Sequence, residues 1–177
     1  MDQFKNKMAK HLFILALVLS IIYTCVIPVA YSQSSDAQLV SLKGQETTYD
    51  QLITTNSVFI YTPGRGAVES TRNWVKVLEP MATEHDIHIR DILAVNVPFF
   101  IDQKTVLKRA RKKIPKRYWD QTWININGDI EEVINAGANR DEAIVMIVDQ
   151  NGNVISRFLG DADAGKLDTI RRTFNNL

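Results

Sequence analysis

The chain has 177 residues, of which 45% are hydrophobic, and this favours one globular domain with an ordinary core. Its formal net charge is +1 at pH 7, so the average charge does not identify a class of partner. The single cysteine, Cys25, falls in an N-terminal segment outside that domain. The composition therefore excludes disulfides, thiol redox catalysis, cysteine nucleophiles and thiolate metal sites from the domain itself.

The N-terminal segment has the pattern of a secretory signal peptide. Lysines precede an uncharged apolar stretch at residues 12–29, and small residues follow it, so cleavage after Ser32 is expected. An uncleaved anchor is the alternative, because an apolar run of about 18 residues approaches the length that spans a bilayer. Either interpretation places the domain outside the cytoplasm. The expected organisation is a signal peptide or anchor at 1–32, a polar linker at 33–38 and a domain at 39–177.

In the first part of the domain, apolar patterns predict strands that alternate with helices. The predicted elements are a short strand with a turn at Gly44, a brief helix at Tyr49–Ile53, a buried strand at Ser57–Thr62, a helix at Ala67–His85, a strand at Ile87–Val97 and a helix at Phe100–Ile114. Pro80 is expected to kink the long helix or to end it early, and Pro115 is expected to end the following one. Phe100 is expected on the apolar face of that second helix.

The second part is predicted to end in a hairpin and a helix. A short strand and turn at Thr122–Asp129 and a helical turn closed by Gly137 come first. Strands at Ala143–Val148 and Val154–Leu159 then flank Asn151-Gly152, a pair favoured in two-residue hairpin turns because both positions need positive φ. The terminal helix is expected to place Leu167, Ile170, Phe174 and Leu177 on one face, with Asp161 or Asp163 as its cap. Crossovers make the early strands parallel, and the hairpin adds antiparallel strands.

This order resembles the thioredoxin-like superfamily, and more closely the YtfJ-like family of exported bacterial proteins. The matching residues are Gly64-Arg65 before the first long helix, Asn96 near a strand end, "WININGD" from Trp123, and the late hairpin "IVMIVDQNGNVISRFLG". The resemblance implies a three-layer α/β fold with a mixed central sheet and flanking helices, and a periplasmic address. Members of that family have no established reaction, so the resemblance implies little chemistry.

Two features of redox thioredoxins are missing from this chain. Residues 63–68 contain no Cys-x-x-Cys at the helix start, where the helix dipole would lower a thiol pKa. Residues 139–145, just before the hairpin, contain no proline where redox members carry a cis-proline. The sequence thus predicts an exported, non-catalytic binding or adaptor protein of the bacterial envelope, without a cofactor.

The junction that replaces the cysteines is a candidate anion site. Gly64, Arg65 and Gly66 could present backbone N–H groups and a guanidinium at a helix start, with Glu69 and Asn73 completing a polar pocket. This is the basis of the alternative prediction, a non-thiol enzyme or an anion-binding protein. The structural interpretation of the same residues is a glycine turn, with Arg65 in solvent or paired with Glu69.

A basic tract is the second candidate site. Eight positive charges occur with no acid between them: Lys104, Lys108, Arg109, Arg111, Lys112, Lys113, Lys116 and Arg117. Aromatic residues follow at Tyr118, Trp119 and Trp123, and such a tract can bind a membrane surface or an acidic envelope polymer. Export argues against nucleic acid as the partner. The alternative is a solvated helix face that pairs with the protein's own acids, with both tryptophans in the core.

Other polar clusters are weaker candidates. His85 and His88 straddle the predicted end of a helix and the start of a strand, so their side chains diverge and no metal site is expected. The oxygens of "DQNGN", from Asp149, are explained by the hairpin turn. No catalytic residue can be named from the pattern.

Overall fold

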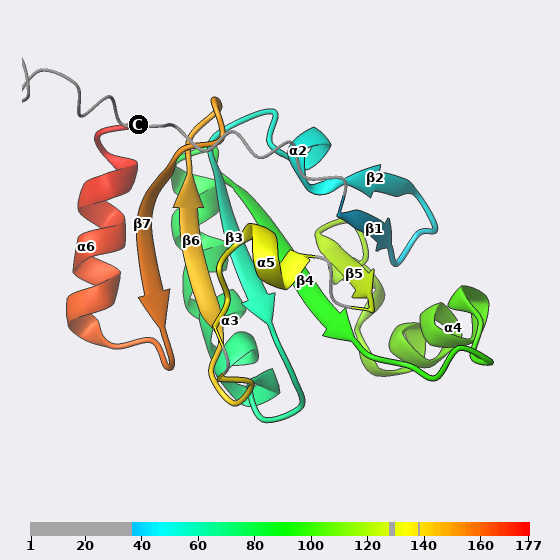
Figure 1. Cartoon of the computed structure of the whole chain (residues 1–177). Coiled ribbons are helices and arrows are strands. Elements are labelled where there is room, and N and C mark those ends of the chain that lie inside the picture. Colours follow the sequence, from blue (N-terminus) through cyan, green and yellow to red (C-terminus); the bar gives the residue numbers. More distant parts are fainter. Residues whose placement is uncertain (1–36, 128–129, 138) are drawn as a thin grey trace, which may run out of the picture. The chain divides into compact units, whose positions relative to one another are not determined.

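A computed structural model describes residues 37–127, 130–137 and 139–177 (Figure 1). The predicted leader and most of the predicted linker lie outside these residues. Strand β1 begins at Gln38, after a buried Ala37. Among the described helices, none is both long and apolar enough to cross a membrane.

The described residues form a seven-stranded mixed sheet with helices on both faces, which confirms the predicted fold class (Figure 1). The strands are β1 (Gln38–Ser41), β2 (Glu46–Thr48), β3 (Ser57–Thr62), β4 (His88–Val95), β5 (Thr122–Ile126), β6 (Ile144–Val148) and β7 (Val154–Leu159). The helices are α2 (Tyr49–Leu52), α3 (Val68–Glu84), α4 (Gln103–Lys113), α5 (Ile130–Val133) and α6 (Ala164–Phe174), with a 3-10 turn at Lys116–Tyr118.

The sheet order is β2-β1-β5-β4-β3-β6-β7. Strands β3, β4 and β5 are parallel neighbours, as the two helical crossovers require, and β6 and β7 add an antiparallel hairpin beside β3. The register pairs Ile60 of β3 with Asp91 of β4, and Asp91 with Thr122 of β5. These three side chains therefore share one face of the sheet.

Three hydrophobic clusters hold the helices on the sheet. On one face, α3 and α6 pack through Trp74, Leu78, Ile170 and Phe174 on β3 and β6, and α4 packs through Val106 and Leu107 on β1 and β5. On the other face, α2 and α5 pack over Phe59, Tyr61 and Trp123. Helix α3 and helix α4 thus lie on the same face, over different strands.

The expected early end of the long helix at Pro80 is wrong. Helix α3 continues through Pro80 to Glu84. The turns on either side of Pro80 bury Leu78, Met81 and Ala82 in the core. Burial of these side chains offsets the backbone hydrogen bond that proline cannot make.

Three other expectations are corrected by the structure. Among the loop residues Gln150–Gly152, Gly152 alone has positive φ, at 85°. Asp149 N–H donates to the Asn153 carbonyl (3.0 Å), so the connection is a three-residue loop rather than a two-residue turn. Phe100 lies outside α4 and is 73% exposed, and Leu177 lies beyond α6 and is 42% exposed. Asp163 caps α6, as one of the two expected residues.

Candidate functional site

The Gly64-Arg65-Gly66 turn lies between the end of β3 and the start of α3, as predicted. Helix α3 begins at Val68, and its N-cap residue, Ala67, provides no side-chain cap. The hydroxyl oxygens of Thr62 and Thr71 are 2.7 Å apart, and their hydrogen bond joins the strand end to the first turn of the helix. This bond fixes how the turn leaves the sheet.

Both glycines of the turn are required by a close neighbour rather than by positive φ. A Cβ added at Gly64 would lie 2.9 Å from the Arg140 carbonyl oxygen, and one added at Gly66 would overlap the Asp141 side chain. Neither glycine has a positive φ. Arg140 and Asp141 therefore contact the Gly64-Arg65-Gly66 turn. In redox thioredoxins the first of these two segments carries the cis-proline and the second carries the cysteines.

Arg140 is held at this junction by an ion pair. Its guanidinium donates to Glu131 (2.8 Å), and the Tyr61 hydroxyl donates to the other oxygen of the same carboxylate (3.1 Å). Burial, then the Glu131 charge, raises the pKa of Tyr61, so its hydroxyl remains a donor. The network ties the end of β3 to α5 and to the loop before β6.

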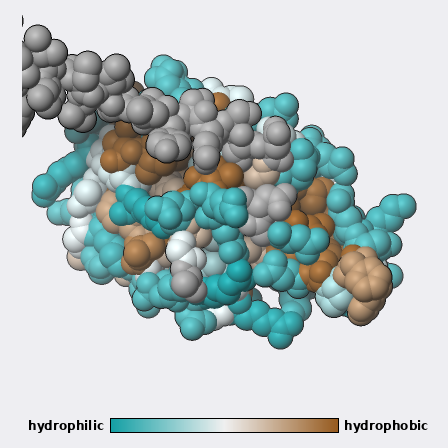
Figure 2. Space-filling model, in the orientation of Figure 1, coloured by the Kyte–Doolittle hydropathy of each residue, from teal (hydrophilic) through white to brown (hydrophobic). Residues whose placement is uncertain are grey.

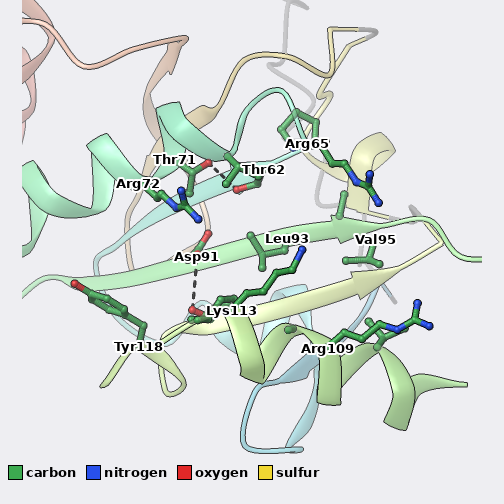
Figure 3. Close-up of a pocket in the computed structure, with 18 of the residues that line it drawn as sticks. Thr62, Arg65, Thr71, Arg72, Asp91, Leu93, Val95, Arg109, Lys113 and Tyr118 are labelled. Carbon is green, nitrogen blue, oxygen red and sulfur yellow. Dashed lines mark hydrogen bonds between the residues drawn. The ribbon is translucent and has the colours of Figure 1, made fainter. Parts of the chain in front are cut away.

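A pocket of about 900 Å³ lies beside this junction, between α3 and α4. Its floor is β4 and the start of β5, including Asp91, Leu93, Val95 and Thr122. In Figure 3, Arg72 from α3 and Lys113 from α4 point into the space over the floor, and Tyr118 lies at one end. The carboxyl ends of β3 and β4 line part of the pocket, and the carboxyl ends of parallel strands are where α/β proteins commonly bind ligands.

The walls of the pocket are apolar, and its charged lining is almost entirely cationic. Apolar side chains include Val68 and Val75 of α3 and Val106 and Ala110 of α4. The six cationic residues are Arg65, Arg72, Lys76, Arg109, Lys113 and Arg140. Among the described lining residues, Asp91 is the single acid. Such a lining suits a ligand with an apolar body and a negative charge.

Asp91 is the chemically unusual member of the lining. Its side chain is 8% exposed, and its Oδ1 atom has no hydrogen-bond partner among the described residues. The Thr122 hydroxyl contacts the other oxygen at 3.5 Å (Figure 3). Burial raises the pKa of Asp91, and the hydrogen bond from Thr122 offsets part of this rise. The resulting pKa is about 7. The carboxyl is therefore substantially protonated near neutral pH and can donate a hydrogen bond.

Gln121, another residue of the pocket lining, has a second unpartnered polar atom. Its side-chain Nε2 is buried without a hydrogen-bond partner in the described part of the chain. Its backbone carbonyl accepts from Asp91 N–H at 2.8 Å, so the two residues are neighbours. An unpaired buried donor or acceptor costs about 1–3 kcal/mol, and a ligand or water that reaches both atoms would recover this energy.

The predicted cleft residues separate into two groups. Gly64 and Arg65 line the pocket, whereas Gly66, Glu69 and Asn73 do not. Glu69 pairs with Arg72 (3.4 Å) instead of Arg65. Glu69 and Asn73 therefore do not join Arg65 in lining this pocket.

The basic tract also separates into residues that line the pocket and residues that do not. Arg109 and Lys113 line the pocket, whereas Lys108, Arg111, Lys112, Lys116 and Arg117 do not. Arg111 donates to the Leu42 carbonyl (2.6 Å) and lies over Trp119, and Arg117 donates to the Tyr118 hydroxyl (2.8 Å). Trp123 is buried and Trp119 half-buried, as the alternative interpretation expected.

The same alternative expected the basic tract to form ion pairs with the protein's own acids, and the structure does not support this. The described ion pairs involve other cations, so no carboxylate in the described ranges neutralises the tract. Within the same ranges no group of three metal-binding side chains occurs. Asp91 and Gln121 were missed, although an acid directly before the apolar run "ILAV", within a predicted strand, was a usable signal.

Comparison with known proteins supports the fold but does not identify a reaction. No protein-family profile and no curated protein sequence matches the chain. Among solved structures, a putative electron transfer protein from Aquifex aeolicus is similar at 16% identity and a TM-score of 0.57, covering 80% of this chain and 91% of its own.

Two further solved structures are proteins of thiol chemistry. A thiol:disulfide interchange protein from Bacteroides sp. is similar at 14% identity and a TM-score of 0.52, covering 78% of this chain and 86% of its own. The thioredoxin domain of a thiol-disulfide oxidoreductase from Bacteroides vulgatus is similar at 13% identity and 0.52, covering 78% and 90%. This chain has one cysteine, Cys25, and it lies outside the described residues. The chain thus has a thioredoxin-like fold whose domain lacks the paired cysteines of redox thioredoxins.

Proposed function

We propose that this chain is an exported, thioredoxin-fold binding protein that holds an anionic ligand with an apolar body in the pocket between α3 and α4. The ligand class is an alkyl or aryl carboxylate or phosphate. The observation that carries the proposal is Asp91, a buried carboxyl with an unpartnered oxygen on the floor of a cationic pocket.

Charge selects the anionic head group. Arg72 and Arg140 each have a carboxylate partner, Glu69 and Glu131. The other four pocket cations have no ion pair with the described residues, so their charge is available to a ligand. Cations that converge on a partly enclosed site bind a carboxylate or phosphate through charge-assisted hydrogen bonds.

Polar atoms on the floor give the head group a position. A protonated Asp91 donates from Oδ1, and Gln121 donates from Nε2, to the same ligand oxygen or to two oxygens of one head group. The apolar walls then hold the body of the ligand, and their burial contributes roughly 25 cal/mol per Å². A neutral molecule would leave the cations desolvated and unpaired.

The cellular setting belongs to the same proposal. The basic and apolar N-terminal pattern supports export, and the Gly64-Arg65 junction supports a YtfJ-like, periplasmic member of the thioredoxin-like proteins. A role as a binding or adaptor protein of the envelope needs no thiol. The absence of cysteine beyond residue 32 supports this part.

The test uses the fluorescent aryl sulfonate 8-anilinonaphthalene-1-sulfonate as the probe. The double substitution Arg109→Glu and Lys113→Glu reverses two pocket charges and should weaken probe binding by about tenfold or more. Decyl phosphate should displace the probe, and decanol should not.

The matched control is Lys104→Glu with Lys108→Glu, which makes the same change of net charge outside the pocket. This pair should leave probe binding nearly unchanged. Equal loss in both double variants would show a general effect of net charge and would refute the pocket.

A further inference from the structure

A turn at the N-terminal end of α4 exposes two aromatic rings. Phe99 is 99% exposed and Phe100 is 73% exposed. They occupy the central positions of a turn that the Ile101 N–H closes on the Pro98 carbonyl (2.9 Å). Turns favour small polar residues, so two adjacent phenylalanines there need a separate reason.

The turn holds the rings outward. Ile101 packs against the hydrophobic cluster under α4, and Pro98 lines the pocket, so both ends of the turn are anchored. The two rings contact each other edge to face, with centroids 5.7 Å apart. In Figure 2 a hydrophobic projection stands at the α4 end of the domain, beside hydrophilic side chains.

Cations follow the exposed rings along the outer face of α4. Lys104, Lys108 and Lys112 recur at every fourth residue, so they form one stripe on the helix. All three are exposed, do not line the pocket and have no carboxylate partner in the part of the chain that the structure describes. Val106 and Leu107 face the sheet instead. The stripe therefore belongs to a surface separate from the proposed ligand site.

From this juxtaposition we propose that Phe99, Phe100, Lys104, Lys108 and Lys112, here called the α4 patch, dock the domain on an anionic phospholipid membrane. The two rings insert at the level of the head groups, and the lysine stripe lies against the lipid phosphates. Aromatic rings favour the membrane–water interface, and each basic residue near an anionic surface strengthens binding several-fold. Charge complementarity selects the membrane over a second copy, because two such stripes would repel each other.

The experiment measures sedimentation of the protein with phosphatidylglycerol and phosphatidylcholine vesicles. The protein is used as it is exported, with its N-terminus determined by mass, so wild type and variants share the same residues before the domain. Binding to phosphatidylglycerol should exceed binding to phosphatidylcholine and should weaken with salt. Phe99→Ser with Phe100→Ser should reduce binding to phosphatidylglycerol by at least about tenfold, because the bound protein loses two rings that insert among the lipid head groups.

The control for the aromatic pair is Val154→Ser with Ile155→Ser, which removes two exposed apolar side chains from β7, at the other edge of the sheet. This control should bind vesicles as the wild type does. Lys104→Gln with Lys112→Gln should reduce binding by about tenfold and should lessen its salt dependence.

Two results would overturn the proposal. One is vesicle binding that the phenylalanine variant retains in full; this would identify a general polyanion surface. The other is an equal loss in the phenylalanine variant and its β7 control. Probe binding in the pocket is measured separately for the same variants and should be unchanged, so failure of either site is distinguishable from failure of the other.

Discussion

Replacing Asp91 with asparagine should remove a large part of the pH dependence of stability between about pH 4 and pH 7. Burial raises the pKa of Asp91 from 3.8 to about 7 in the folded chain. Between these values the unfolded chain releases the proton while the folded chain keeps it, so stability falls as pH rises. At 1.36 kcal/mol per unit, the wild type loses on the order of 4 kcal/mol across this range, and the loss is complete above pH 7.

The described charged residues that line the pocket together with Asp91 are all cations. They are Arg72 and Lys76 of α3, Arg109 and Lys113 of α4, Arg65 of the loop before α3 and Arg140 of the loop before β6. Positive charges favour the ionised carboxyl, so about 4 kcal/mol is the upper value expected for this loss of stability. Urea unfolding of wild type and Asp91→Asn at several pH values measures the slope. Asp161→Asn, an exposed carboxyl near α6, is the control and should keep the wild-type slope. The same slope in Asp91→Asn and wild type would contradict the burial of a neutral carboxyl.

Truncating Trp74 to alanine should destabilise the domain by about 3–5 kcal/mol. The side chain is 0% exposed and packs between α3 and the β6–β7 hairpin, and its Nε1 donates to the Gly160 carbonyl at 2.6 Å. Removal leaves a large cavity and an unpaired carbonyl. This is a large fraction of the 5–15 kcal/mol that holds a typical domain folded.

Trp74→Phe serves as the matched variant, because it keeps most of the ring and loses the hydrogen bond. It should cost less than half as much as the alanine substitution. Urea unfolding followed by far-ultraviolet circular dichroism gives both values. Since Thr71 and Val75, next to Trp74 on the surface of α3, line the pocket, Trp74→Ala should also weaken binding of the anilinonaphthalene probe. A cost below about 1 kcal/mol for Trp74→Ala would contradict the core position of this residue.

The sheet and its crossovers could be predicted because their signals are local. The apolar run at Ser57–Thr62 and the periodic apolar residues of α3 each define an element without reference to distant residues. The hairpin strands and the Asp163 cap are equally local. Phe100 was placed on the apolar face by helical spacing, whereas the turn at Pro98–Ile101 ends before the helix begins.

The pocket could not be predicted because it depends on long-range packing. Its two helical walls come from segments on either side of β4, and its floor depends on the register of Asp91 with Thr122. Sequence reasoning named Arg65 and the basic tract, but it could not show that Arg109 and Lys113 alone among the predicted tract residues turn toward the junction. The unpartnered atoms of Asp91 and Gln121 become visible when the sheet is assembled.

The most direct test of the proposed binding site is the side-chain amide signal of Gln121 in the nitrogen-15 spectrum, followed during titration with decyl phosphate. The account predicts a saturable shift of this signal, together with shifts of backbone amides in Thr62–Arg65 and Asp91–Val95, at the concentrations that displace the fluorescent probe. Shifts confined to Lys104, Lys108 and Lys112, or a Gln121 signal that does not move at saturation, would contradict it.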